Sequence, residues 1–205
     1  MPWNDRYARQ DKPWDTGRPS SELRRLINEL AIAPCRVLEI GCGTGTTAVD
    51  LARQGYDVTA VDVAPLAIEA ARGRARQEGV RVAFALADLL APLAEQAFWD
   101  NRPFPLVFDR GVYHALRRVD LDSLLRTIRD VTAKGGFYIV LAGNANESFE
   151  GEGPPRVRAD ELCGELASGF ELVQLREFRF DASEAGGRRV RPLAWSAVLR
   201  RTAAP

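Results

Sequence analysis

The chain has 205 residues, of which 46% are hydrophobic and 27% are charged, and its 28 basic and 28 acidic side chains cancel. This length and composition predict one folded domain over residues 1–205 and exclude a disordered chain. A net charge of zero provides no broad positive field for a polyphosphate, so we expect no nucleic-acid partner.

No apolar run approaches the roughly 20 residues that a membrane helix needs, so we expect no membrane partner. The three cysteines show no metal-ligand spacing and are odd in number, which predicts neither a zinc site nor a disulfide framework. Together these features favour a cytoplasmic protein without a bound metal.

The first predicted elements form a strand, turn and helix unit. After a polar leader (1–19), Ser20 is suited to cap a helix whose apolar residues recur at helical spacing until Pro34 ends it. Residues 36–40 indicate a buried strand, 41–45 a glycine turn, and the residues from Ala48 onward a second amphipathic helix.

Strands and helices continue to alternate along the chain, at 57–62, 65–78, 80–87, 91–98, 105–109, 120–133 and 137–142. Such alternation predicts a Rossmann-like, doubly wound α/β fold with a mostly parallel sheet. A helix near 159–168, a strand at 170–178, a turn at 182–191 and a strand at 193–201 follow. The last two strands predict a hairpin, so we expect seven strands with the last one antiparallel.

The glycine turn carries the main functional signal. Ligands of open parallel sheets collect at the carboxyl ends of the strands, where this turn lies. Thr46 stands where the dinucleotide fingerprint requires its third glycine, which disfavours NAD. Glu39 would repel a pyrophosphate but suits a cation, and Asp62, at the end of the second strand, can accept both hydrogens of a ribose diol. A ligand with a ribose and a positive charge describes S-adenosylmethionine (SAM).

The order of four motifs supports this interpretation. VLEIGCGTG (37–45), VTAVDVAP (58–65), ADLL (87–90) and VFDRG (107–111) resemble class I SAM-dependent methyltransferases over essentially the whole chain. KPWDTGRPSSEL (12–23), DRGVYHAL (109–116) and GPPRV (153–157) further resemble bacterial enzymes related to thiopurine S-methyltransferase and tellurite-resistance methyltransferases. The resemblance implies SAM as cofactor, S-adenosylhomocysteine as product and a small-molecule acceptor, with residues 1–33 as a leader and helix that cover the cofactor site.

The resemblance also implies roles for individual residues. Gly41 and Gly43 would contact the methionine portion, Glu39 its amino group and Asp62 the ribose. Val63, Asp88 and Leu89 would surround the adenine, while Trp14, Arg18, Asp109 and Arg110 would close the site. Three alternatives stay open: Asp88 as a helix cap, Trp14 as a pin for the leader, and Arg18 as a solvated side chain or a ligand of an anionic acceptor.

His114 is the only histidine and follows the fourth predicted strand, where acceptors of the resembling enzymes dock. It is a candidate general base, with Tyr113 as a second candidate, and a structural role is the alternative for His114. We expect a sulfur acceptor first and an oxygen or other nucleophile next. An NAD-dependent oxidoreductase and a SAM-binding protein without catalysis are the alternatives, and the oligomeric state stays open.

Overall fold

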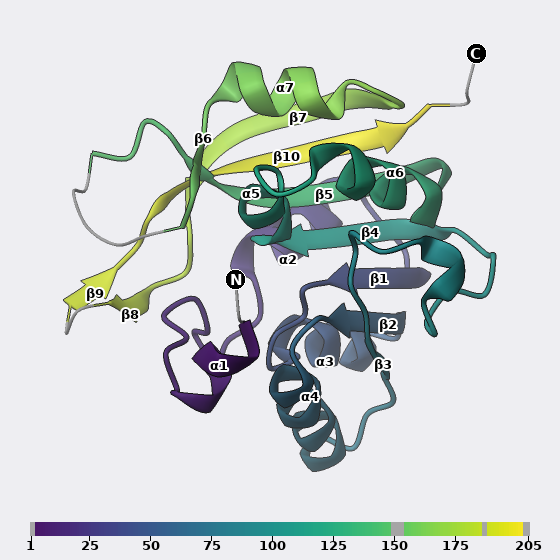
Figure 1. Ribbon diagram of the computed structural model, residues 1–205, viewed down its shortest axis with the longest axis vertical. Helices are drawn as coiled ribbons and strands as arrows, with labels where there is room; N and C mark the ends of the chain where they lie inside the picture. Colours follow the sequence, from purple (N-terminus) through teal and green to yellow (C-terminus); the bar gives the residue numbers. More distant parts are fainter. Residues whose placement is uncertain (1–2, 149–153, 186–187, 203–205) are drawn as a thin grey trace.

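The computed structural model describes residues 3–148, 154–185 and 188–202, which form a central sheet with helices on both faces (Figure 1). Seven strands follow the order β3-β2-β1-β4-β5-β10-β7, and a two-residue strand, β6, pairs with β5. The strands of this sheet are β1 (Arg36–Ile40), β2 (Asp57–Asp62), β3 (Ala83–Leu86), β4 (Phe104–Arg110), β5 (Thr132–Asn144), β6 (Arg156–Val157), β7 (Phe170–Arg179) and β10 (Leu193–Arg201).

Two hydrophobic layers hold the helices to the sheet. Helices α2, α3 and α4 contribute to the layer on one face, and α5, α6 and α7 contribute to the layer on the other (Figure 1). Successive strand residues point to opposite faces, so Val37 lies in the first layer and Leu38 in the second. The helices are α1 (Trp3–Ala8), α2 (Ser21–Glu29), α3 (Thr46–Arg53), α4 (Pro65–Gln77), α5 (Val112–Leu116), α6 (Leu121–Val131) and α7 (Ala159–Leu166), with a 3-10 turn at Leu93–Glu95.

The strand order places a switch point beside β1. The chain runs outward from β1 through β2 to β3 and then returns to β4 on the other side of β1. The segments that follow β1 and β4 therefore leave the sheet in opposite directions, which opens the position where such sheets bind ligands. Both the glycine turn and the DRG segment lie at this position.

The predicted doubly wound sheet is confirmed, with parallel pairing from β3 to β5 and an antiparallel last strand. β10 pairs antiparallel with both β5 and β7, so the last strand lies inside the sheet and not at its edge. The Ser20 cap is also confirmed, because its hydroxyl accepts a hydrogen bond from the Leu23 amide at 3.2 Å. None of the described helices combines the length and the hydropathy that a bilayer crossing needs.

Some local predictions need correction. The strand expected at 80–87 is limited to β3, and the helical stretch expected at 91–98 is one 3-10 turn. The segment 182–191 was predicted as a turn, but it contains a second small sheet of β8 (Ser183–Ala185) and β9 (Arg188–Val190), with residues 186–187 outside the described part.

Helices α1 and α5 were not predicted because each is short and depends on contacts from outside itself. The Asp109 carboxylate accepts the amides of Val112 and Tyr113 at the start of α5. In α1, Tyr7 is buried against residues of α4. Helices this short are marginal without such tertiary contacts.

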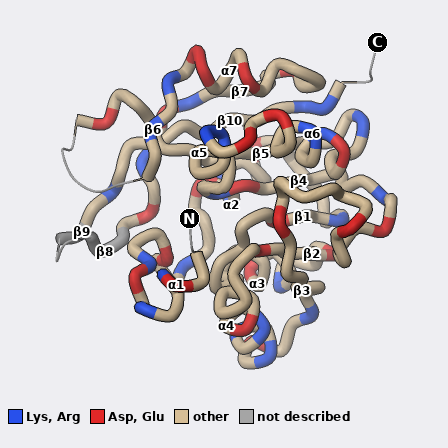
Figure 2. Tube along the Cα trace, viewed as in Figure 1, with Lys and Arg blue, Asp and Glu red and all other residues tan. Residues whose placement is uncertain are grey.

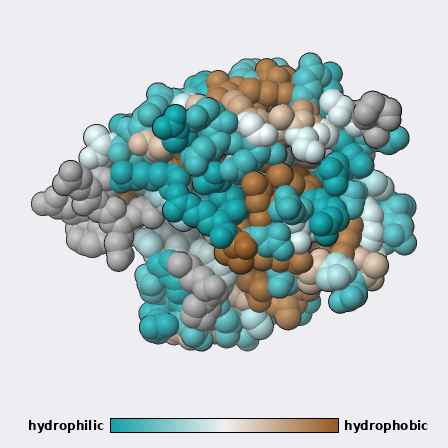
Figure 3. Space-filling model, turned by 45° about the horizontal axis from the view of Figure 1, so that its top comes forward, coloured by the Kyte–Doolittle hydropathy of each residue, from teal (hydrophilic) through white to brown (hydrophobic). Residues whose placement is uncertain are grey.

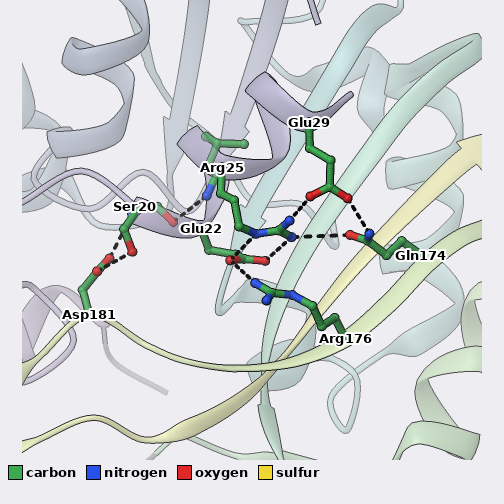
Figure 4. Close-up of polar contacts among 9 residues, drawn as sticks. Ser20, Glu22, Arg25, Glu29, Gln174, Arg176 and Asp181 are labelled. Atoms are coloured by element: carbon green, nitrogen blue, oxygen red, sulfur yellow. Dashed lines mark hydrogen bonds and ion pairs between the residues drawn. The ribbon is translucent and has the colours of Figure 1, made fainter. Parts of the chain in front are cut away.

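A polar network fastens α2 to strand β7 (Figure 4). The Glu22 carboxylate is almost fully buried and accepts hydrogen bonds from Arg25 at 2.8 Å and Arg176 at 2.7 Å. Glu29, one turn beyond Arg25, pairs with the same Arg25 and accepts a hydrogen bond from Gln174 at 2.8 Å. The buried carboxylate thus has two cationic partners, one on its own helix and one on the sheet.

We expect Glu22→Ala to lower the free energy of unfolding by about 1.5–3 kcal/mol, because it removes charge-assisted hydrogen bonds from a buried site. The matched control is Glu29→Ala on the same helix. Its carboxylate is about two-fifths exposed, so the loss should stay below about 1 kcal/mol. Urea unfolding of the two variants beside the wild type measures the difference, and equal losses would contradict the importance of Glu22 burial.

Candidate functional site

The glycine turn after β1 has a backbone conformation that favours glycine at three positions, and at two of them a side chain would also meet a neighbouring element. Gly41, Gly43 and Gly45 all have positive φ, of 64°, 53° and 75°. A Cβ on Gly41 would collide with the Val112 side chain, and one on Gly43 would stand 3.0 Å from the Tyr7 hydroxyl. The turn is therefore enclosed by α5 on one side and by the leader on the other.

Asp62 fixes the turn from the end of the neighbouring strand β2. One carboxylate oxygen accepts the Gly43 amide at 2.9 Å, and the other accepts the Ala64 amide at 2.9 Å. Burial raises the pKa of this carboxyl, and the backbone amides oppose that effect. Each oxygen retains a further lone pair, so the geometry is compatible with a diol as an additional ligand.

Glu39 is the least satisfied group of the site. Its side chain is 5% exposed, and its Oε2 has no hydrogen-bond partner among the described residues. Burial raises its pKa to about 8, while a hydrogen bond from the Ala48 backbone and the positive charge of Arg110 oppose the shift. A buried acceptor without a partner costs free energy, which a cationic donor placed beside it would recover.

Exposed apolar side chains stand at the ends of β2 and β3, where Asp62 and Leu86 are partners in register. Val63, directly after Asp62, is 47% exposed, and Leu66 and Leu86 are further exposed large side chains near the ends of β2 and β3. Figure 3 shows apolar side chains gathered between hydrophilic ones on one face of the molecule. Single exposed apolar residues are ordinary, but several next to buried carboxylates suit the flat face of a base.

The segment after β3 carries Asp88 and Leu89. Asp88 is exposed, accepts the Leu90 amide at 3.0 Å, and donates its own amide to Gln96 at 3.2 Å. No helix begins at Asp88, so the alternative of a helix cap is wrong, and the carboxylate instead stabilises a turn. Leu89 is buried, and its carbonyl accepts the Thr127 hydroxyl.

The leader is fastened over the turn by polar contacts. The Thr44 hydroxyl donates to Asp15 at 2.9 Å, and Asn4 accepts the free amide of Leu66 near the start of α4 at 3.0 Å. Further along, Arg110 donates to the Trp14 carbonyl at 3.3 Å. These contacts attach residues 4–15 to three different elements around the site.

Trp14 lies in an aromatic cluster of the leader. Its ring meets Trp3 and Tyr7 edge to face at 5.5 and 6.1 Å, and the Arg6 guanidinium lies 4.3 Å from its centre. This packing agrees with the alternative in which Trp14 pins the leader. Arg18 is exposed, and its side chain forms no ion pair within the described residues.

Tyr7 is a site residue that the sequence did not reveal. Its side chain is buried, its hydroxyl faces Gly43, and burial together with the negative charge of Asp62 raises its pKa. No periodic pattern distinguishes it from the other aromatic residues of the leader, because its position depends on how α1 docks onto α4.

Asp109 has a different role from the predicted one. Its carboxylate is fully buried and accepts hydrogen bonds from the Val112 amide, the Tyr113 amide and the Tyr138 hydroxyl at 2.7–2.9 Å. Burial raises its pKa to about 6. With both oxygens engaged inside the protein, Asp109 positions α5 and is not available for direct contact with a cofactor.

Tyr113 also needs correction as a catalytic candidate. Its ring is fully buried, and its hydroxyl donates to Glu165 of α7 at 2.6 Å. Arg117 pairs with the same carboxylate. Burial raises the pKa of the Tyr113 hydroxyl, which opposes its ionisation, so the residue connects α5 to α7.

His114 is held in one tautomer. The Gly143 amide donates to His114 Nδ1 at 2.9 Å, so the proton of the neutral ring resides on Nε2. Burial lowers its pKa to about 4, and the charge of Arg110 acts in the same direction. The imidazole is therefore neutral at physiological pH, and the lone pair that a general base would use is already engaged.

Arg110 supplies a positive charge among the buried acidic side chains of the site. Burial lowers its pKa, whereas the carboxylates of Asp181, Glu39 and Asp15 oppose that shift. Its guanidinium lies 5.3 Å from the centre of the Phe180 ring, which comes from the end of β7. The side chain thus joins the leader, β4 and the C-terminal part of the sheet.

The segment after β5 forms one wall of the site. The Asn144 amide donates to Glu177 at 2.9 Å, and Glu147 accepts the Leu193 amide at 2.6 Å. Both side chains fix this segment to β7 and β10. Residues 149–153, including the first residue of GPPRV, lie outside the described part.

Comparison with known proteins agrees with this geometry. Residues 37–136 match the family described as "Methyltransferase domain". The chain is 32% identical over 130 residues to the "2-heptyl-1-hydroxyquinolin-4(1H)-one methyltransferase" of Mycobacteroides abscessus, which covers 63% of this chain and 55% of that protein. It is 26% identical over 116 residues to the "Probable S-adenosyl-L-methionine-dependent methyltransferase TehB" of Haemophilus influenzae, covering 57% and 38%. The chain thus spans about half the length, or less, of these curated relatives.

Solved structures extend the match to nearly the whole chain. The structure described as "Conversion of a Disulfide Bond into a Thioacetal Group during Echinomycin Biosynthesis" has a TM-score of 0.78 at 25% identity, covering 93% of this chain and 85% of that one. TehB from Haemophilus influenzae has a TM-score of 0.70 at 20% identity, covering 88% and 62%.

These matches confirm the class I methyltransferase fold. They also confirm the resemblance to class I SAM-dependent methyltransferases, with TehB among them, and residues 37–136 carry the match to the methyltransferase family. That family uses SAM, so the family match favours SAM over the alternative of NAD.

We expect Glu39→Gln to stabilise the fold in a pH-dependent manner. The pKa of Glu39 is raised in the folded protein, so the stability it contributes is present at low pH and is lost as pH rises toward about 8. The neutral glutamine avoids this loss, so its advantage should be absent near pH 4 and grow by roughly 1 kcal/mol per pH unit above pH 5.

Urea unfolding at pH 5, 6.5 and 8 measures this difference. Glu177→Gln is the control, because hydrogen bonds from Asn146 and Asn144 lower the pKa of that exposed carboxyl. It should show no gain at high pH. If the stability of Glu39→Gln changed with pH in parallel with that of the wild type, a raised pKa of Glu39 in the folded protein would be contradicted.

Proposed function

We propose that the chain is a SAM-dependent methyltransferase that acts on a small nucleophile, with residues 1–205 as one domain and residues 1–33 covering the cofactor. The observation that carries this proposal is the unpartnered, buried Glu39 Oε2 beside a glycine turn and the Asp62 carboxylate. A ligand that brings both a cation and a diol would satisfy these groups, and SAM supplies both together with a methyl group on a positively charged sulfur.

The proposed contacts follow from this arrangement. Glu39 binds the amino group, Asp62 binds the ribose, and the backbone of Gly41 and Gly43 lies along the methionine portion. Val63, Leu89 and Asp88 surround the adenine. Tyr7, Trp14 and Arg110 close the site and exclude water, while Asp109 acts through α5.

A sulfur acceptor is supported by the state of His114. An alcohol must lose its proton during attack, which calls for a positioned base, whereas a thiol can arrive as the thiolate. The Gly143 amide occupies the Nδ1 lone pair of His114, and its Nε2 carries a proton. His114 can therefore donate a hydrogen bond through Nε2 but cannot accept the acceptor's proton in this tautomer.

The similar structure described by the conversion of a disulfide bond into a thioacetal group also concerns sulfur chemistry. Oxygen is the second candidate, because the matched proteins include the "Ubiquinone biosynthesis O-methyltransferase" of Xylella fastidiosa, 35% identical over 91 residues. A small-molecule acceptor is consistent with both.

Calorimetric titration with SAM, followed by S-adenosylhomocysteine release with matched thiols and alcohols, tests the proposed function. We expect SAM binding, turnover of thiols, and binding weakened by about 1.5–3 kcal/mol in Asp62→Asn, since a hydrogen bond to a charged group is lost. Binding of NAD without SAM would overturn the proposal. SAM binding without turnover of either panel would indicate a binding protein without catalysis.

His114→Asn tests the nature of the acceptor. The asparagine oxygen can still accept the Gly143 amide, so the fold of the segment is retained while the imidazole is removed. For a thiol acceptor we expect kcat within about threefold of wild type and an unchanged pH profile from about pH 5.5 to 9, because a positioned base normally contributes about 10²–10⁴-fold. A thousandfold loss of kcat with the neutral limb of the profile removed would identify His114 as a base and favour an alcohol.

A further inference from the structure

A groove with arginine walls lies on the outer side of the sheet, between the second half of α4 and the edge strand β3. Its volume is about 310 Å³, and it is lined in part by Arg72, Arg76 and Arg81. Asp62 and Val63 precede the start of α4, whereas this groove lies along its C-terminal half. Figure 2 shows basic positions gathered at that end of α4. The groove is therefore separate from the proposed cofactor site.

The arginines of the groove have no acidic partner. Arg72 and Arg76 are one helical turn apart and lie on the same side of α4, and Arg81 follows from the segment that leads into β3. Within the described residues, none of the three forms an ion pair, and no carboxylate lines the groove. By contrast, the nearby Arg53 of α3 is paired with Glu78.

One hydrogen bond fixes an arginine of the groove against the sheet. Arg72 donates to the carbonyl of Phe84 on β3 at 2.9 Å. The Arg76 guanidinium extends back along α4 and lies 3.8 Å from where a Cβ on Gly73 would stand, an ordinary contact distance.

The floor of the groove is apolar. Ala75, Val82 and Phe84 form it between the arginines. A bare inorganic anion would engage the guanidinium groups but would leave this floor exposed to water. An anion with an apolar body would use both surfaces, and a volume of this size fits a small molecule.

We propose that this groove binds a small organic anion, with a carboxylate or similar head group on the arginines and an apolar body on the floor formed by Ala75, Val82 and Phe84. The ligand supplies the counter-charge that the protein does not provide at this place. The proposal does not depend on methyl transfer and concerns a site distinct from the glycine turn.

Titration of the ¹⁵N-labelled full chain with octanoate, followed by NMR, tests the proposal. We expect saturable shifts of amides within residues 72–84. Acetate has the head group without the body, and octan-1-ol has the body without the charge, so each should bind at least tenfold more weakly. Octanoate shifts that do not saturate, or that map elsewhere, would overturn the proposal, as would acetate or octan-1-ol binding as tightly as octanoate.

The double variant Arg76→Gln/Arg81→Gln should weaken octanoate binding at least tenfold. The matched control is Arg118→Gln/Arg126→Gln, which removes the same total charge from residues outside the groove and should leave the affinity unchanged. Equal weakening in both double variants would show a general charge effect and would overturn the site. Unchanged binding in Arg76→Gln/Arg81→Gln would do the same.

Discussion

Three carboxylates, those of Glu39, Asp62 and Asp109, are buried near the carboxyl ends of β1, β2 and β4. The rest of the site follows from which hydrogen-bond donors each of them has. Burial raises the pKa of all three, so each needs donors to remain ionised at neutral pH. Asp62 and Asp109 obtain them from backbone amides, which fixes the glycine turn and the start of α5. Glu39 obtains a backbone amide from Ala48 and the charge of Arg110, but its Oε2 retains no partner among the described residues.

This difference separates Asp109, which is fully buried and serves the fold, from Glu39, whose unpartnered oxygen suits a ligand. Asp62 combines both roles, because its oxygens hold the turn and each retains a further lone pair. A carboxylate whose oxygens accept hydrogen bonds from the protein makes the fold more rigid. A buried carboxylate oxygen without a donor lowers the stability of the unliganded protein and strengthens the binding of a cationic ligand. Under the proposed function, part of the affinity for SAM therefore comes from removing a cost already present in the fold. Under that proposal, the same Glu39 carboxylate lowers the stability of the fold and raises the affinity for the cofactor.

Features that depend on local sequence could be predicted from it. The glycine turn, the Asp62 strand end and the Ser20 cap each involve residues a few positions apart or adjacent strands, and their geometry matches the prediction. The direction of a strand-end side chain could not be predicted in the same way. Asp109 points toward Tyr138, a partner 29 residues away in the chain, and this decides that it serves the fold.

Elements stabilised from outside themselves were also missed. Helix α1 has six residues and depends on contacts of Asn4 and Tyr7 with α4, which no periodic pattern encodes. The segment 182–191, in which β8 pairs with β9, was predicted as a turn. Its Gly and Arg residues mark a connection but do not indicate a strand register. The tautomer of His114 likewise depends on Gly143, a residue without a side chain.

The position of β10 between β5 and β7 has a consequence for the order of assembly. Within the described residues, β7 pairs with the main sheet only through β10, although it precedes β10 in the chain. During synthesis, β7 must therefore wait with both edges unpaired until the later strand arrives to join it to β5. Pairing between distant segments slows folding and leaves strand edges exposed to other chains. The last step of sheet closure is thus the period in which a nascent molecule is most open to misassembly.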